Sequence, residues 1–308
     1  MSRRANSDRA MHPNFALHRL ADDVRPDEKD IHLVRDRFGI VHRALSRAFP
    51  GSRFVPIGSH SRSTGIAVHS HIDFLAVLPS AWRKGGGHPV SPAAVIDRMT
   101  EHMDYLPSAL AADLRCDRCG VEVYFKGTNF ALDVIPGFMV GTADQHPVYS
   151  ILGQGYRWIE TSPERHNALF SNSNARSNAK LRAVSQLIKV WRYAHSPPLG
   201  ISGLYVDMLL ATSDVGTGVK SYGQCMKDFF SELVRERLTC LKDPAGLSDV
   251  IAPSPSKGAF ERLYDAAKIA ARHAQAALDA QARGTYSEAN CEWDAIFKHR
   301  LSWQLLVQ

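Results

Sequence analysis

The feature that most constrains the fold of this chain is a change of sequence pattern near residue 156. Before it, short apolar runs of strand length alternate with segments of helical spacing. After it, strand-like alternation stops, and helical spacing covers residues 174–195, 202–212, 222–240 and 257–282. The sequence therefore predicts an α/β domain with an N-terminal helix over residues 1–155, followed by a helical lobe over residues 156–308.

The first half contains the elements of a small mixed domain in a definite order. An amphipathic helix over 31–48 precedes a short strand at Phe54–Ile57, the turn Gly58-Ser59, and an apolar strand at 72–78. A further helix is expected over 93–106, and paired strands are expected at 121–125 and 130–135 around a turn at 126–129.

Composition excludes several classes of protein. Hydrophobic residues make up 44% of the chain and charged residues 22%, which is typical of globular proteins. Because no apolar run of about 18 residues occurs and the N-terminus is polar, we expect a cytoplasmic protein with no membrane partner. The five scattered cysteines suit a reducing compartment, and Cys116 and Cys119 lack the further ligands of a zinc site.

Carboxylates and a Gly-Ser turn in the first half suggest phosphoryl transfer. Alternation along the strand places His71 and Asp73 on one face. Asp133 stands in an apolar strand, where a metal or cation would offset the cost of burial. The backbone N–H groups of Gly58-Ser59 could approach a phosphate. Taken alone, Asp133 fits a salt-bridge partner and Gly58-Ser59 an ordinary turn, so the combination carries the interpretation.

A basic helix in the second half is a candidate phosphate-binding surface. Between Arg165 and Arg192 there are six basic residues and no acidic one, within a chain whose net charge is +6. One helical stripe is apolar, and the next face carries Ser185 and Lys189. That face could meet phosphate, and the alternative is a solvated charged surface.

These motifs together resemble a known family. Gly58-Ser59 is followed, after eleven residues, by His71-Ile72-Asp73, and a further acid, Asp133, lies on a later strand. The second half adds the segments at 161–167, 187–191, 202–207, 243–246 and 293–297. In this order the motifs resemble the CD-NTase family, bacterial relatives of cGAS and oligoadenylate synthetase in the polymerase β superfamily. The resemblance implies a polymerase β-like nucleotidyltransferase core, a C-terminal helical domain and an active-site cleft between them.

The resemblance also implies roles for individual residues. Asp73 and Asp133 match the second and third metal ligands, which would hold Mg²⁺ or Mn²⁺, and Asp133 could help deprotonate the attacking hydroxyl. Gly58, Ser59, Lys189 and Ser202 match residues that hold the triphosphate. The implied reaction joins nucleoside triphosphates into a cyclic or short linear oligonucleotide, releases pyrophosphate and, in bacteria, serves antiphage signalling through a downstream effector.

The departure from the family pattern is His71, which stands where the first metal-binding acid is expected. A neutral imidazole supplies no negative charge and suits Mg²⁺ poorly. His71 is therefore either a metal ligand with altered preference or a structural histidine. Two alternatives follow: a catalytically impaired homologue that binds nucleotides or nucleic acid, and a transferase that extends nucleic-acid oligomers.

Overall fold

The computed structural model describes residues 11–299 except for 68–70, 86–87, 104–111, 118, 126–130, 154–156, 249 and 255. The chain divides into two compact units, and each is described by itself. The sheet unit consists of the described residues of Pro26–Ala168 and Ala245–Asp249. The helical unit consists of those of Met1–Arg25, Leu169–Pro244 and Val250–Gln308.

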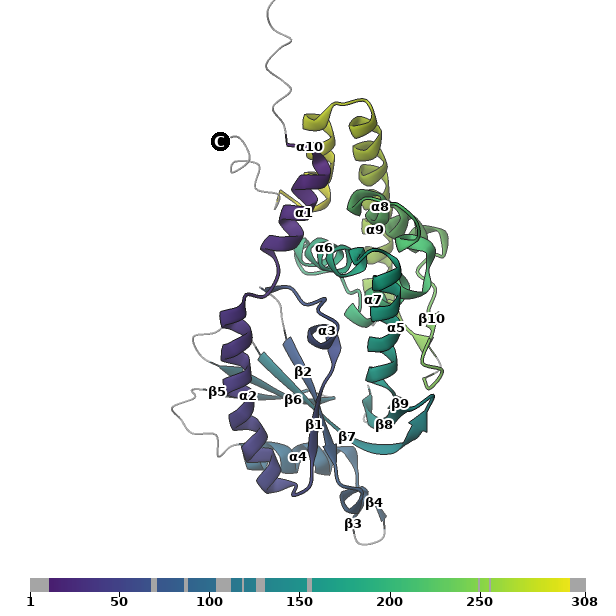
Figure 1. Cartoon of the computed structure of the whole chain (residues 1–308). Coiled ribbons are helices and arrows are strands. Elements are labelled where there is room, and N and C mark those ends of the chain that lie inside the picture. Colours follow the sequence, from purple (N-terminus) through teal and green to yellow (C-terminus); the bar gives the residue numbers. More distant parts are fainter. Residues whose placement is uncertain are drawn as a thin grey trace, which may run out of the picture. The chain divides into compact units, whose positions relative to one another are not determined.

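A seven-stranded mixed sheet organises the sheet unit (Figure 1). Its strands run in the order β1-β2-β7-β6-β5, and β8 and β9 continue from β7. Strands β2 and β7 pair in parallel, every other pair is antiparallel, and a register shift interrupts the β7–β8 pair between Met139 and Gly141. The strands are β1 Arg53–Pro56, β2 His71–Leu78, β5 Ala112–Asp117, β6 Gly120–Phe125, β7 Ala131–Ala143, β8 His146–Gly153 and β9 Arg157–Thr161.

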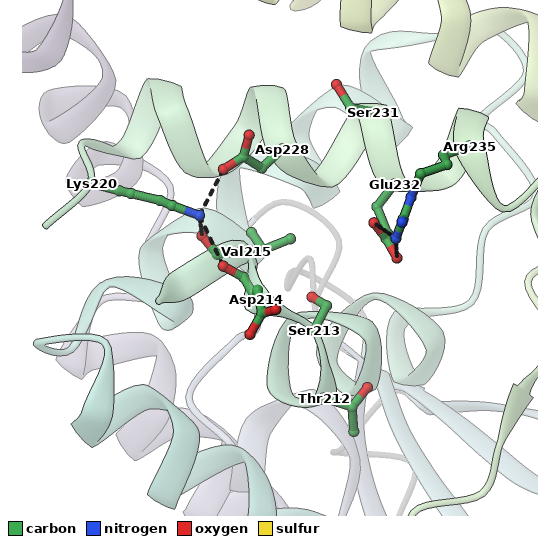
Figure 2. A pocket seen from close by; sticks show the side chains of 9 residues that line it. All are labelled: Thr212, Ser213, Asp214, Val215, Lys220, Asp228, Ser231, Glu232 and Arg235. Carbon is green, nitrogen blue, oxygen red and sulfur yellow. Dashed lines mark hydrogen bonds and ion pairs between the residues drawn. The ribbon is translucent and has the colours of Figure 1, made fainter. Parts of the chain in front are cut away.

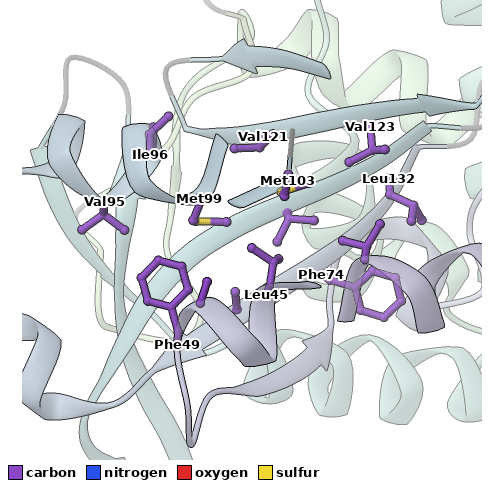
Figure 3. Close-up of a cluster of buried hydrophobic side chains, with 14 of the residues drawn as sticks. Leu45, Phe49, Phe74, Val95, Ile96, Met99, Met103, Val121, Val123 and Leu132 are labelled. Carbon is purple, nitrogen blue, oxygen red and sulfur yellow. The ribbon is translucent and has the colours of Figure 1, made fainter. Parts of the chain in front are cut away.

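Helices α2 (Glu28–Ala48) and α4 (Pro92–Met103) cover one face of this sheet. Figure 3 shows their apolar side chains meeting those of the strands in one cluster, among them Leu45, Met99 and Phe74. On the opposite face of β2, Leu75 and Val77 belong to a second apolar cluster. The predicted alternation of β2 is therefore confirmed, and it leaves His71 and Asp73 on the face away from α2 and α4.

Short elements complete the sheet unit. They are α3 Gly58–Ser61, the 3₁₀ helix η2 Ser80–Arg83, β3 Lys84–Gly85 and β4 His88–Pro89. The expected strand pair at 121–125 and 130–135 is present as β6 and β7, and its turn at 126–129 lies outside the described residues. Strand β9 contradicts the expectation that strands end near residue 156, because its five residues pair with β8.

Helices make up most of the helical unit. They are α1 Pro13–Asp23, most of α5 Pro163–Arg176, α6 Lys180–Ala194, α7 Gly203–Thr212, α8 Tyr222–Arg235, α9 Lys257–Ala282 and α10 Tyr286–Ile296, together with the 3₁₀ helix η4 Asp214–Gly216 and the strand pair β10 Leu241–Lys242 and β11 Val250–Ile251. A capping box at Ser221 and Gln224 starts α8. None of the described helices has the length and apolar character needed to cross a bilayer.

Local backbone geometry explains two differences from the helices expected in the second half. The expected helix at 174–195 is two helices, because Asn178 and Ala179 adopt left-handed φ angles of 58° and 61°. Helix α8 ends at Arg235 rather than near 240, because Arg237 and Leu238 also have positive φ. The domain boundary at residues 155 and 156 remains a prediction, whereas the compact units divide the chain at 25/26, 168/169, 244/245 and 249/250.

Candidate active site

Two aspartates lie side by side where β2 and β7 pair. Asp73 is the direct partner of Asp133 in this parallel pair, so both side chains leave the same face of the sheet. His71, two residues earlier on β2, reaches Asp133 with its Nδ1 atom 3.0 and 3.1 Å from the two carboxylate oxygens. The structure therefore brings together three of the residues singled out from the sequence.

The electrostatics of this group show an excess of negative charge. Burial and, after it, the neighbouring charge of Asp133 raise the pKa of Asp73 to about 7, while the charges of His71 and Arg62 oppose the shift. The hydrogen bond that His71 donates to the Asp133 carboxylate raises the pKa of His71 above its ordinary value. The carboxylates of this group thus repel one another, and a divalent cation would offset that repulsion.

Gly58 is held against Asp73 so closely that no side chain fits at this position. Its φ is +69°, and a Cβ atom added there would lie 1.8 Å from Oδ2 of Asp73. Ile57 also donates its backbone N–H to the carbonyl oxygen of Asp73 at 2.9 Å. The neighbouring Ser59 accepts the backbone N–H of Thr64 through its carbonyl oxygen. The predicted Gly-Ser turn is therefore fastened to the strand that carries the aspartate.

A polar network supports α3, and sequence reasoning did not select it. Arg62 is buried, with 4% of its surface exposed, and donates from Nη1 to Oδ1 of Asn167 at 3.3 Å. Ser61 donates to the carbonyl oxygen of Gly58 at 2.9 Å and lies 3.2 Å from the same Asn167 oxygen. Arg62 also lowers the pKa of Asp73 through its charge. It is thus a cation whose position stabilises the Asp73 carboxylate.

Glu122 is a second residue that sequence reasoning missed. It lies on β6 directly across from Asp133. Among the described residues, His71, Glu122 and Asp133 each offer one ligand atom, and these atoms lie within 4.8 Å of one another. In each residue pair between β6 and β7, the two residues are equally far in sequence from the point between residues 127 and 128. The turn expected at 126–129 has the same centre, so it implies this register from the sequence.

Lys189 and Ser202 belong to the helical unit, and the structure places them near each other. Ser202 caps α7 by accepting the backbone N–H of Tyr205, and the Cε atom of Lys189 lies 3.7 Å from where a Cβ on Gly203 would stand. Lys189 is buried and forms an ion pair with Asp207 at 3.2 Å.

The helix face expected to meet phosphate is therefore largely buried. Ser185 is fully buried and donates to the same Asp207 oxygen at 2.6 Å, and only Arg182 on that face is well exposed. The reason is that α6 contacts three other helices of its unit, α1, α7 and α8, so packing extends beyond a single stripe.

Solved structures of other proteins resemble the fold of this chain. No family model matches the sequence, and no curated protein matches it significantly. CdnC of E. coli MS115-1, solved in complex with HORMA-deltaN, is 19% identical with a TM-score of 0.68 and covers 94% of this chain and 98% of its own. The same CdnC solved with ATP is 18% identical, with a TM-score of 0.67 and coverage of 92% and 97%.

A second protein of known structure matches as well. Vibrio cholerae DncV, a cyclic AMP-GMP synthase solved with the linear intermediate 5′ pppA(3′,5′)pG, is 14% identical with a TM-score of 0.61 and covers 83% of this chain and 71% of its own. This chain has the CD-NTase fold. The expected fold class, a polymerase β-like core with a helical domain, is confirmed. At these identities, the similarity establishes the fold alone, and conclusions about activity rest on the residues of the site.

Within this CD-NTase fold, a polar cavity of about 350 Å³ in the helical unit is the competing candidate site (Figure 2). Its lining carries two cations and three acids, so its formal charge is negative. Figure 2 shows Lys220 turned to Asp228, at 2.8 Å, and Arg235 to Glu232, at 2.6 Å. Because both cations are paired with acids in the lining, the cavity is poorly suited to a triphosphate.

Proposed function

We propose that this chain is a metal-dependent nucleotidyltransferase that joins nucleoside triphosphates into a cyclic or short linear oligonucleotide. The observation that carries the proposal is the pairing of Asp73 with Asp133 on adjacent strands of a CD-NTase fold, with Gly58 packed against the Asp73 carboxylate. A carboxylate pair that can hold a divalent cation beside a Gly-Ser turn suits metal-assisted phosphoryl transfer. The product would be a second messenger read by an effector, in bacterial antiphage signalling.

The donor set fits a divalent cation. Asp73, Asp133 and His71 offer carboxylate oxygens and an imidazole nitrogen. The pKa of Asp73 is raised first by burial and then by the charge of Asp133, and a cation would neutralise that charge. A bound Mg²⁺ or Mn²⁺ neutralises charge on the reacting phosphate and lowers the pKa of the attacking hydroxyl. Asp73 and Asp133 would hold the ion, and His71 would be its nitrogen ligand.

The remaining roles follow from what each side chain can donate or accept. Asp133 would accept the proton of a ribose hydroxyl while the hydroxyl oxygen forms a bond to the α-phosphorus. The bond between the α- and β-phosphates then breaks, and pyrophosphate leaves. Gly58 and Ser59 would hold the phosphates by backbone N–H groups and a hydroxyl, and Lys189 and Ser202 would bind the triphosphate.

A second candidate function is nucleotide binding without turnover. The observation in its favour is His71, which hydrogen bonds to Asp133 in place of the first acid of the family pattern. Such a protein would bind the nucleotide without catalysing the reaction.

Product analysis separates these functions. The protein is incubated with labelled nucleoside and deoxynucleoside triphosphates, with Mg²⁺ or Mn²⁺, and the products are resolved by chromatography. A cyclic or short linear product that is absent with Asp133→Asn supports the proposal. Binding without product supports the second candidate, and extension only of an added nucleic acid supports a transferase that acts on oligomers.

A further inference from the structure

Glu122 has a position that the family pattern does not assign. In β6, Val121 and Val123 are fully buried in the core beneath α2 and α4, so Glu122 and Tyr124 leave the opposite face. That face also carries the two aspartates. Strand register then sets Glu122, Asp133 and Asp73 in one row across β6, β7 and β2.

A hydrogen bond fixes the Glu122 carboxylate in this row. The hydroxyl of Tyr124 donates to Oε2 of Glu122 at 2.7 Å, and the Arg115 guanidinium stacks over the Tyr124 ring at 4.4 Å. Carboxylates that bind metal ions are commonly oriented by such outer hydrogen bonds. The ring of Tyr124 also meets the His71 ring edge to face, with centroids 6.2 Å apart.

The number of carboxylates supports the same conclusion. The family pattern has three acids, and this chain has His71 in place of one of them. With Glu122 the row again holds three carboxylates, now from three strands. The ligand atoms of His71, Glu122 and Asp133 lie within 4.8 Å of one another, and two ligands of a single ion are up to ~4.4 Å apart. Small side-chain rotations would therefore bring all three onto one ion.

We infer that Glu122 supplies the acidic ligand that position 71 lacks, so that it joins Asp73, Asp133 and His71 in holding the divalent cation of the proposed function. The imidazole nitrogen favours Mn²⁺ over Mg²⁺ at this site. The inference rests on the proposed function for the use of the ion in catalysis, and binding of the ion can be measured without any reaction.

The test is a titration of the full chain with Mn²⁺, with and without a non-hydrolysable ATP analogue. Binding is measured as the loss of the electron paramagnetic resonance signal of free Mn²⁺. Glu122→Gln keeps size and hydrogen-bonding shape, and we expect Mn²⁺ affinity to fall at least about tenfold, since even outer-sphere partners contribute 10–100-fold. Glu160→Gln is the matched control, because Glu160 is an exposed glutamate on β9. Its Mn²⁺ affinity should equal that of the wild type.

Two further measurements identify the ligands. Electron spin echo modulation of bound Mn²⁺ should show coupling to a ¹⁴N nucleus that His71→Ala removes. In the double variant His71→Asp/Glu122→Gln, a carboxylate at position 71 should restore Mn²⁺ affinity without the ¹⁴N coupling. This rescue also shows that Glu122→Gln remains folded.

The outcomes distinguish this inference from the proposed function. Mn²⁺ affinity unchanged by Glu122→Gln, while Asp133→Asn abolishes binding, would overturn the role of Glu122 and leave the proposed function intact. Weak binding that falls equally in Glu160→Gln would mean an adventitious ion only, and overturns the inference. Tight binding lost in Glu122→Gln, together with absence of any nucleotide product from the wild type, would support the metal site and refute the proposed reaction.

Discussion

Replacing Gly58 with alanine tests how the Gly-Ser turn and the metal-binding strand depend on each other. The added Cβ would stand 1.8 Å from Oδ2 and 2.6 Å from Cγ of Asp73, so the carboxylate must leave its position. A matched control exists in the same unit. Gly246 has a φ of +68°, almost identical to the +69° of Gly58, and nothing lies within 4 Å of its added Cβ.

The two variants separate backbone strain from steric conflict. A left-handed φ costs an alanine ~1–2 kcal/mol, which both variants share. Gly58→Ala also forces Asp73 from its rotamer, at a further ~0.5–1.5 kcal/mol. Urea denaturation should therefore show Gly58→Ala to be less stable than Gly246→Ala by about 1 kcal/mol. Mn²⁺ binding and nucleotide synthesis should be lost in Gly58→Ala and retained in Gly246→Ala.

A double-mutant cycle completes the test. Asp73→Ala removes both carboxylate atoms that the new Cβ would meet and leaves only the Cβ of residue 73, at 3.0 Å. Gly58→Ala should consequently destabilise the Asp73→Ala protein by only about as much as Gly246→Ala does. Equal costs for Gly58→Ala in both backgrounds, and equal to that of Gly246→Ala, would refute the steric reasoning.

Three further predictions concern the site. Asp73→Asn and Asp133→Asn should each abolish synthesis at unchanged thermal stability, and equal product from wild type and either variant would contradict the metal assignment. Calorimetry should show that Lys189→Ala weakens binding of a non-hydrolysable triphosphate about ten- to a hundredfold. The same variant should destabilise the fold by ~3–5 kcal/mol, because Asp207 loses its buried cationic partner. The double variant Lys189→Met/Asp207→Leu should recover stability without recovering triphosphate affinity. His71→Asp should raise Mg²⁺ affinity and Mg²⁺-dependent synthesis, and a wild type already fully active with Mg²⁺ would show that His71 is not a weakened ligand.

The sequence alone predicted the part of the site that depends on strand periodicity. Alternation in β2 placed His71 with Asp73, and the apolar strand around Asp133 marked the second acid. Glu122 was missed because the pattern of a strand tells which residues share a face and does not tell which neighbour lies alongside. Register between strands decides that, and the turn expected at 126–129 implies it only once the two strands are paired residue by residue.

The helical part was predicted less well for a related reason. Helical spacing identified the apolar stripe of α6 but treated Lys189 as part of an open face. The residue that pairs with it, Asp207, lies 18 positions later on another helix. The periodicity of one helix does not tell how many other helices pack around it. A buried ion pair such as that of Lys189 and Asp207 is therefore found only in the folded structure.

The register shift in β7 has a consequence for how this chain can change length in evolution. It lies between Met139 and Gly141, several residues beyond Asp133, and it affects only the pairing with β8. One residue inserted between 131 and 133 would instead turn Asp133 toward α2 and α4 and remove an acid from the row. Related chains should therefore vary in length where β7 pairs with β8, beyond Met139, and keep a constant number of residues in β7 up to Asp133.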